Sequence, residues 1–176
     1  IAAVFITLHV VHMHGWIHNE SWLHRVVEPL GGAQFRAYNA TSTAGMALQN
    51  VVVVVLYAIG ITACVYHLAN GIWTMGITWG VWTSPRAQRR ASYVCTGFGI
   101  LLMVVSATAL FGVRAAVDDP AKLREVRAQE DLMIQTKIAT GDVQANEHKV
   151  ADPLPDDEAD DAAAPEAAPA PSAAAN

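Results

Sequence analysis

The feature that most constrains this chain is a long stretch without a single charged side chain. Between Arg36 and Arg86 the sequence contains no Asp, Glu, Lys or Arg, and residues 49–82 are apolar apart from Gln49 and Asn50 at the start, His67, Asn70 and a few hydroxyl groups. A helix rises about 1.5 Å per residue, so about 20 residues cross a hydrocarbon core about 30 Å thick. The stretch therefore predicts a transmembrane helix with length to spare for tilt.

Two more apolar segments flank this one. Residues 91–113 form a second uncharged stretch, long enough for another crossing, which ends at Arg114. The opening segment, from Ile1 to about His14, is too short to cross alone. Because the sequence opens inside an apolar run, with neither a methionine nor the basic start of a signal peptide, we expect a fragment whose earlier helices are missing. The pattern predicts an all-α membrane protein built as a transmembrane helix bundle.

The connection between the two complete spans predicts their orientation. The short loop 83–91 carries three arginines and no acid. Basic residues are enriched in cytoplasmic loops, so we expect this loop to be cytoplasmic and the C-terminal tail to lie on the outer face. Tryptophans near both ends fit interfacial aromatic belts. They are Trp73, Trp79 and Trp82 near the arginines, and Trp16 and Trp22 at the other end.

The formal net charge of −5 hides two unlike regions. Residues 1–117 carry a formal +4 and hold the apolar stretches, whereas residues 118–176 carry −9. We therefore expect a transmembrane domain over 1–117, a soluble helical extension over 118–150 and a disordered Ala/Pro/acidic tail over 151–176. The last segment cannot bury enough apolar area to offset its ordering entropy.

One helix is predicted inside the acidic region, from Asp119 to about Thr140. Asp118 and Asp119 favour a helix N-terminus, and Pro120 suits a position in the first turn. This helix would form the core of the soluble extension.

His67 lies well inside the longest apolar stretch, where an ionisable side chain is costly and tends to face a partner or a cofactor. Its helical neighbours at i−7, i−4, i−3 and i+4 are all small, namely Gly60, Ala63, Cys64 and Gly71. Such a strip leaves a shallow groove in which a planar macrocycle could lie with its iron on the ring nitrogen. The same spacing also allows two helices to pack closely, so both interpretations stay open.

A second group of histidines begins at His9, which occupies a comparable position in the opening segment. These side chains could serve a metal-dependent membrane hydrolase that uses His9, His12, His14 and His18. Catalytic zinc, however, usually takes three protein ligands plus water, and no carboxylate lies close by to act as a base. Residence at the membrane surface is the favoured explanation for His12, His14, His18 and His24.

The remaining chemistry in the sequence is sparse. Cys64 and Cys95 have no ligand-like spacing and are expected to be packing residues. The sequence has no glycine-rich phosphate loop, nucleophile elbow, pair of buried carboxylates or basic stripe for nucleic acid. A membrane region that offers histidines and little else suits a holder of a redox cofactor. A cofactor-free anchor or transporter, in which the buried histidines only pack, is the third interpretation.

Four short segments of the sequence resemble segments of one known protein family. They are Phe5-Ile6-Thr7-Leu8-His9-Val10, Tyr66-His67-Leu68-Ala69-Asn70-Gly71-Ile72-Trp73, Thr78-Trp79-Gly80 and Ser84-Pro85-Arg86-Ala87-Gln88-Arg89. With them, residues 1–15 and 50–115 resemble the third, fourth and fifth helices of the single-polypeptide dihaem cytochrome b anchor of succinate dehydrogenase and fumarate reductase.

The resemblance implies a five-helix bundle with two stacked b haems, each held by two histidines from different helices. His9 would be an axial iron ligand of the haem distal to the catalytic subunits, and His67 of the proximal haem. Their partner histidines would belong to the first and second helices, which this sequence lacks. Haem b is therefore the expected cofactor.

The implied role is a non-catalytic electron-transfer and anchor subunit of succinate:quinone oxidoreductase in the bacterial inner (cytoplasmic) membrane. Bis-histidine ligation leaves no open iron position, so the haems would pass electrons between an iron–sulfur subunit and membrane quinone. The expected partners are the iron–sulfur and flavoprotein subunits, quinone and the lipid bilayer, with no nucleic acid. Arg86, Arg89 and Arg90 would neutralise haem propionates or dock the iron–sulfur partner, although cytoplasmic placement alone also explains them.

Overall fold

The structure is a computed structural model that describes residues 1–14 and 19–154. Its longer helices are α1 (Ala2–His14), α3 (Ala40–Ala47), α4 (Val51–Thr78), α5 (Pro85–Ala115) and α6 (Pro120–Ala139). The short segments α2 (Glu20–Trp22), Leu23–Val27 and Glu28–Leu30 lead toward α3, and a single turn, Glu147–Lys149, follows α6. These described residues contain no strand, which confirms the all-α prediction. His18, Trp16 and residues 155–176 of the predicted tail lie outside the described residues.

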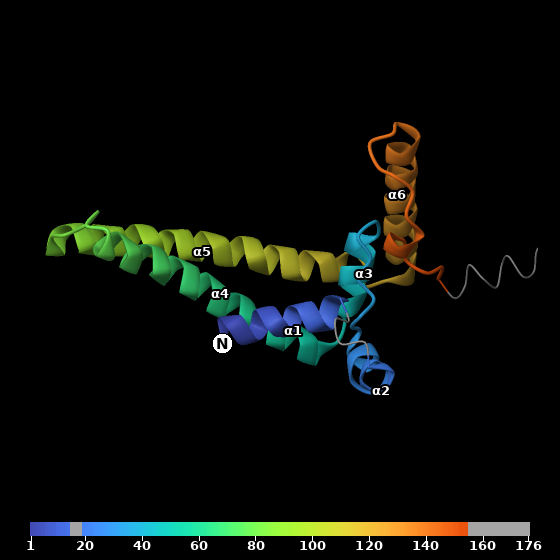
Figure 1. Ribbon diagram of the computed structural model, residues 1–176, viewed down its shortest axis with the longest axis horizontal. Helices are drawn as coiled ribbons and strands as arrows, with labels where there is room; N and C mark the ends of the chain where they lie inside the picture. Colours follow the sequence, from blue (N-terminus) through green and yellow to red (C-terminus); the bar gives the residue numbers. More distant parts are fainter. Residues whose placement is uncertain (15–18, 155–176) are drawn as a thin grey trace, which may run out of the picture.

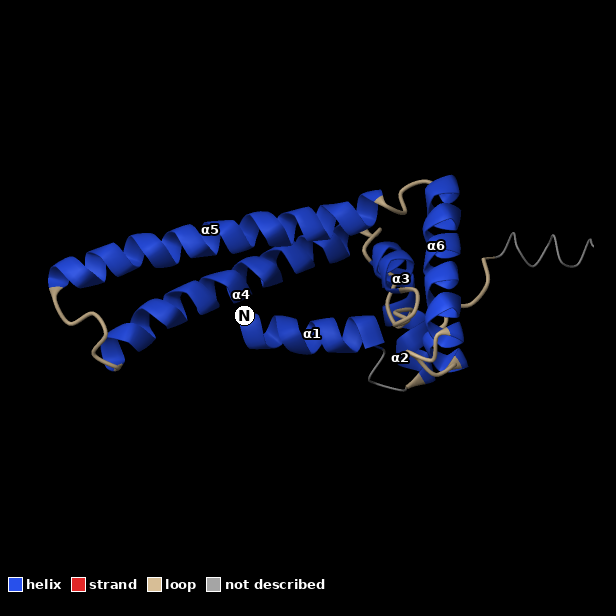
Figure 2. Cartoon of the chain, turned by 90° about the horizontal axis from the view of Figure 1, so that it is seen from above, coloured by secondary structure: helices blue, strands red, loops and turns tan. Residues whose placement is uncertain are grey.

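Helices α4 and α5 form a long antiparallel hairpin (Figure 1 and Figure 2). Asn50 starts α4, because its side chain accepts a hydrogen bond from the Val52 amide at 2.9 Å. The helix ends at Thr78, and Gly80 follows in the left-handed conformation with a φ of 72°. Both helices are long and apolar enough to cross a membrane, in agreement with the two spans expected from the sequence.

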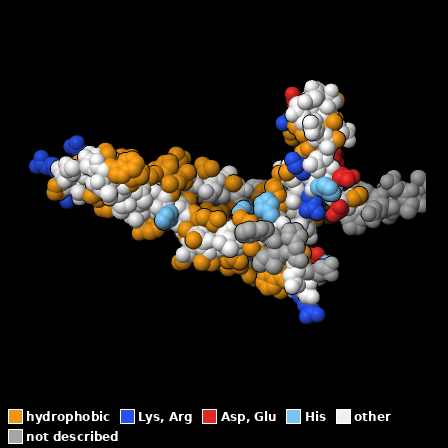
Figure 3. Space-filling model, viewed as in Figure 1, with side chains coloured by type: hydrophobic (Ala, Val, Ile, Leu, Met, Phe, Trp, Pro, Cys, Tyr) orange, Lys and Arg blue, Asp and Glu red, His pale blue; other side chains and the backbone are white. Residues whose placement is uncertain are grey.

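The arginine-rich segment is helical, which corrects the expected loop 83–91. Ser84 accepts a hydrogen bond from the amide three residues later at 3.2 Å, and Pro85 takes the first helical position, where an N–H is not needed. The helix therefore begins before the arginines, and the loop is reduced to the few residues that precede Pro85. All three arginines are exposed in the first turns of α5, at the tip of the hairpin (Figure 3).

Helix α1 lies alongside the half of α4 that is farther from the arginines (Figure 2). Gly60 permits this approach, because a Cβ atom at that position would overlap the ring of Phe5. The Phe5 ring also meets the ring of Tyr57 edge-on, with 5.3 Å between the centroids. Part of the small-residue strip on α4 therefore serves helix packing, which was one of the two interpretations of that strip.

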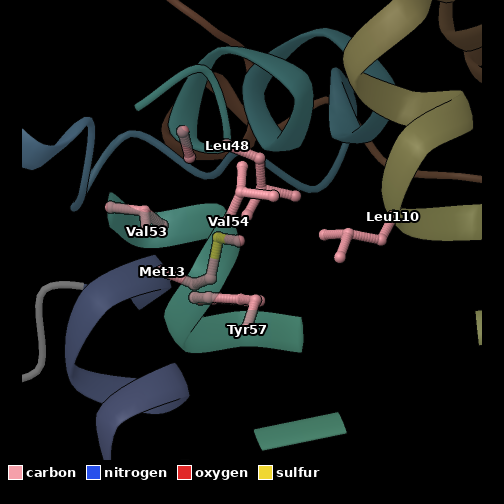
Figure 4. Packing of buried hydrophobic residues seen from close by; sticks show 7 residues of the cluster. Met13, Leu48, Val53, Val54, Tyr57 and Leu110 are labelled. Atoms are coloured by element: carbon pink, nitrogen blue, oxygen red, sulfur yellow. The ribbon is translucent and has the colours of Figure 1, made fainter. Parts of the chain in front are cut away.

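The buried core lies where α1, α3, α4 and α5 meet, at the end of the hairpin away from the arginines (Figure 4). Its side chains are Met13, Ala47, Leu48, Val53, Val54, Tyr57 and Leu110. Tyr57 is the one member of this cluster with a hydroxyl group, and only 8% of it is exposed. The core therefore fixes the position of a polar atom between α1 and α4.

Helix α6 crosses the end of the hairpin and docks on α3 (Figure 1). The buried carboxylate of Glu130 accepts hydrogen bonds from the amides of Thr41 at 2.7 Å and Ser42 at 3.2 Å, and from the Ser42 hydroxyl at 2.7 Å. Beside it, Asn39 donates from Nδ2 to Asp131 at 2.9 Å. One side chain of α6 thus satisfies two of the free amides at the start of α3.

The start of α6 matches the helix predicted in the acidic region. Asp119 accepts a hydrogen bond from the Ala121 amide at 2.7 Å, and Pro120 is the first helical residue. The helix ends at Ala139, close to the expected end.

Much of the surface of α4 and α5 is apolar and is not covered by the rest of the chain (Figure 3). Val55 and Ile59 of α4 and Leu101 and Val105 of α5 are each more than half exposed. Soluble monomers rarely expose apolar patches of this extent, whereas lipid or neighbouring membrane helices accept them. The exposed surface and the lengths of the two helices fit a membrane protein.

Candidate functional site

The first candidate ligand, His9, belongs to a cluster of polar side chains that forms around Tyr57. The Nδ1 atom of His9 lies 3.2 Å from the Tyr57 hydroxyl oxygen, and the Nδ1 atom of His12 lies 3.1 Å from the same oxygen. The Nε2 atom of His12 lies 3.1 Å from the backbone carbonyl oxygen of Leu30. Both imidazoles meet the tyrosine ring at a steep angle, with 5.7 Å between the centroids. Two histidines of α1 therefore share one hydroxyl group of α4.

The second candidate ligand, His67, lies on the face of α4 that points away from α5. Tyr66, Ala69 and Trp73 of α4 line a groove of about 520 Å³ against α5. At about 100° per residue, His67 is about 200° around the helix from Ala69. Its imidazole is exposed, and it makes no hydrogen bond or ion pair with the described residues. The side chain is therefore free to bind something that lies outside this chain's own helices.

The small-residue strip beside His67 divides into a closed part and an open part. Gly60 is covered by Phe5, whereas a Cβ atom at Gly71 would meet no atom within 4 Å. Both glycines share the helix face of His67, because they are seven residues before it and four residues after it. Only the end of the strip beyond α1 is open to a flat ligand.

The two candidate histidines do not meet. His9 contacts Tyr57, and Tyr57 precedes His67 by ten residues on the same helix, which corresponds to about 15 Å along its axis. The cluster around Tyr57 and the exposed side chain of His67 are therefore two separate places along α4.

His9 and His67 each have a ring nitrogen that is available to bind iron. His67 has both ring nitrogens unpaired within the described structure, and open space lies beside Gly71. His9 is half-buried and uses Nδ1 toward Tyr57, which leaves Nε2 without a protein partner among the described residues. Histidine ligands of metals almost always give their second ring nitrogen to a hydrogen bond, as His9 does here.

The other two described histidines near the start of the chain, His14 and His24, do not converge on a metal site. The ring of His14 packs edge-on against Phe35 at 5.3 Å, and His24 pairs with Glu28 at 2.8 Å on the surface. No group of three or more His, Cys, Asp or Glu side chains suited to a metal occurs within residues 1–14 and 19–154. The described residues therefore do not support the hydrolase interpretation, and its remaining member, His18, lies outside them.

Sequence reasoning identified His9 but missed the residues that hold it. His12 was assigned to the membrane surface, and Tyr57 was read as part of an apolar run. The sequence feature that could have indicated Tyr57 is its hydroxyl group, which is the one side-chain polar atom among residues 51–61. Tyr57 also lies three positions before Gly60. The Leu30 carbonyl could not have been found, because its position depends on how the connection after α1 folds back.

One comparison with known proteins bears on this arrangement. Over 55 residues the chain is 34% identical to the succinate dehydrogenase cytochrome b558 subunit of Bacillus subtilis (strain 168). The match covers 31% of this chain and spans 27% of that protein. No family model matches the chain, and no solved structure matches it. Over this part of its length, the chain is therefore similar to a cytochrome b subunit of succinate dehydrogenase.

Proposed function

We propose that this chain is part of the cytochrome b membrane anchor of succinate:quinone oxidoreductase. In this role it is a non-catalytic subunit that passes electrons between the iron–sulfur subunit and membrane quinone through two b haems. The observation that carries the proposal is the pair of histidines on neighbouring helices, each with a ring nitrogen that no described residue occupies. The similarity to a cytochrome b558 subunit supports the same assignment.

In the proposed complex, His9 and His67 would each supply one axial nitrogen to a haem, and histidines of two further helices would supply the others. The haem contributes one-electron chemistry, and ligation by two histidines leaves no iron position open to a substrate. Helices α1, α4 and α5 would then be the third to fifth helices of a five-helix bundle. The uncovered apolar faces of α4 and α5 leave room for the other two.

The exposed arginines at the tip of the hairpin support an orientation in the bacterial inner membrane. The exposed arginines at the start of α5 make no ion pair with the described residues, and basic residues favour the cytoplasmic side. This end would face the iron–sulfur and flavoprotein subunits. Helices α3 and α6 would lie on the outer face.

Haem content tests the proposal in the complete complex. We expect His9→Ala and His67→Ala each to lose one of the two b haems, measured as pyridine haemochrome per assembled complex. His148→Ala, which changes an exposed histidine of the tail, is the matched control and keeps both haems. Full haem content in both of the first two variants would reject the assignment.

A cofactor-free membrane anchor is the second candidate. The contacts of His9 and His12 with Tyr57 favour it, because they are interhelical hydrogen bonds of the kind that stabilise membrane helices without a cofactor. This candidate predicts an assembled complex that contains no haem in the wild type. Haemochrome analysis of the wild-type complex therefore separates the two functions.

A further inference from the structure

The contacts around Tyr57 form one continuous chain from the connection after α1 to His9. The chain runs from the Leu30 carbonyl to His12 at 3.1 Å, from His12 to the Tyr57 hydroxyl at 3.1 Å, and from that hydroxyl to His9 at 3.2 Å. It begins at a backbone atom and ends at a proposed haem ligand. Every polar atom between those two ends has a partner.

The direction of each hydrogen bond in this chain follows from its starting point. A carbonyl oxygen can only accept, so the Nε2 atom of His12 must carry a hydrogen and donate it to Leu30. In neutral His12 the Nδ1 atom is then an acceptor, and the Tyr57 hydroxyl donates to it. The Tyr57 oxygen has a lone pair left for the N–H at Nδ1 of His9. Neutral His9 therefore keeps its unshared electron pair on Nε2.

The packing of Tyr57 keeps this arrangement in place. Its ring is in the buried core and meets the Phe5 ring edge-on at 5.3 Å, while Phe5 itself fills the space above Gly60. A buried hydroxyl without partners would be costly, so the two imidazoles are also its necessary partners. The tyrosine cannot turn away from His9 without leaving the core.

We propose that Tyr57 and His12 are positioning residues that hold His9 in the tautomer with hydrogen on Nδ1 and a free electron pair on Nε2. That tautomer is the one required of an axial ligand that binds through Nε2. The inference rests on the proposed function, because it assigns a role to residues beside the His9 haem. Neither Tyr57 nor His12 would contact the iron, because both act through His9.

A hydrogen bond given from Nδ1–H makes the ligating nitrogen a stronger electron donor, which favours ferric iron. Loss of the Tyr57 hydroxyl should therefore raise the midpoint potential of the His9 haem. The His67 haem should keep its midpoint potential, because His67 lies about 15 Å from Tyr57 along the axis of α4.

The test is a redox titration of the assembled complex, combined with the electron paramagnetic resonance spectrum of its ferric haems. We expect Tyr57→Phe to keep both haems, raise the potential of one and shift the g values of that haem alone. Tyr93→Phe is the matched control, since Tyr93 is 72% exposed on α5 and contacts none of the described histidines. Unchanged potentials and g values in Tyr57→Phe, or equal shifts of both haems, would overturn the inference.

A second variant separates positioning from packing. In His12→Ala the Tyr57 hydroxyl loses its acceptor and can donate to His9 instead, which favours the tautomer with hydrogen on Nε2. We expect this variant to weaken retention of the His9 haem, and addition of Tyr57→Phe to restore it, because the competing donor is removed. Haem loss that is unchanged or greater in the double variant would reject the proposed direction.

The two proposals fail in different ways. A wild-type complex without haem, or full haem retention in His9→Ala, would reject the proposed function. Normal haem loss in His9→Ala together with wild-type behaviour of Tyr57→Phe and His12→Ala would reject only the positioning role. If Tyr57→Phe does not assemble, His12→Ala provides the same decision, because its side chain is only half-buried.

Discussion

At the residue scale, the proposed haem site at His67 depends on open space as much as on the imidazole. The four small neighbours of His67 are evident in the sequence, and they predict either a ligand groove or close helix packing. The structure assigns Gly60 to packing, because Phe5 covers it, and leaves Gly71 open. The sequence could not make this division, because it depends on where α1 crosses α4.

The open space beside Gly71 leads to a direct prediction. Gly71→Leu should fill the open space next to His67 and cause loss of the proposed His67 haem, while the complex still assembles. Gly97→Leu is the matched control, since Gly97 also lies in a membrane helix with no atom within 4 Å of its Cβ position. Haem content and redox potentials of the two variants provide the comparison. Equal haem content in both would contradict a haem on this face.

At the scale of single elements, sequence and structure agree on the two long apolar helices and on α6, but α3 was not predicted and α5 begins earlier than expected. The uncharged stretches predicted α4 and α5, because crossing a membrane requires apolar length. The arginines were expected in a loop, yet Ser84 and Pro85 form a helix start and carry them into α5. Ser84 and Pro85 are a helix-start pattern that the sequence already contains. The expected loop rested on the three arginines instead.

The contact between α1 and α4 can be tested with one methyl group. Gly60→Ala places a Cβ atom in the Phe5 ring, and overpacking of this kind typically costs about 1–3 kcal/mol. We expect the complex to unfold at a lower temperature and Phe5→Ala to recover part of the loss in the double variant. Gly112→Ala, at an open position of α5, should leave the unfolding temperature unchanged. An equal effect of the two alanines would argue against close packing of α1.

At the scale of the whole molecule, a membrane hairpin is joined to helix α6, which folds over one of its ends (Figure 1). The sequence predicted the helix from its cap residues, but it did not predict that Glu130 would dock it on α3. Glu130 lies 88 residues from Ser42 in the chain, and such a contact leaves no local pattern. The same limit applies to the contact of His9 with Tyr57, which are 48 residues apart.

Removal of the Glu130 charge tests this docking. Glu130→Gln exchanges one acceptor oxygen for an NH₂ group beside the amides of α3, and loss of a buried hydrogen-bond partner typically costs about 1–3 kcal/mol. We expect faster hydrogen exchange in α6 and unchanged exchange in α4. Glu125→Gln, on the exposed side of α6, is the control. Unchanged exchange in α6 would show that Glu130 does not hold the helix.

The proposed function requires that His9 and His67 each bind the iron of a separate b haem, together with a second histidine from another helix. The most direct measurement is the dithionite-reduced minus oxidised absorption spectrum of the native complex, recorded before and after addition of carbon monoxide. We predict b-type absorbance that carbon monoxide does not alter, because two histidines leave no open position on the iron. A complex without b-type absorbance, or one in which carbon monoxide binds readily to the reduced haems, would contradict the assignment.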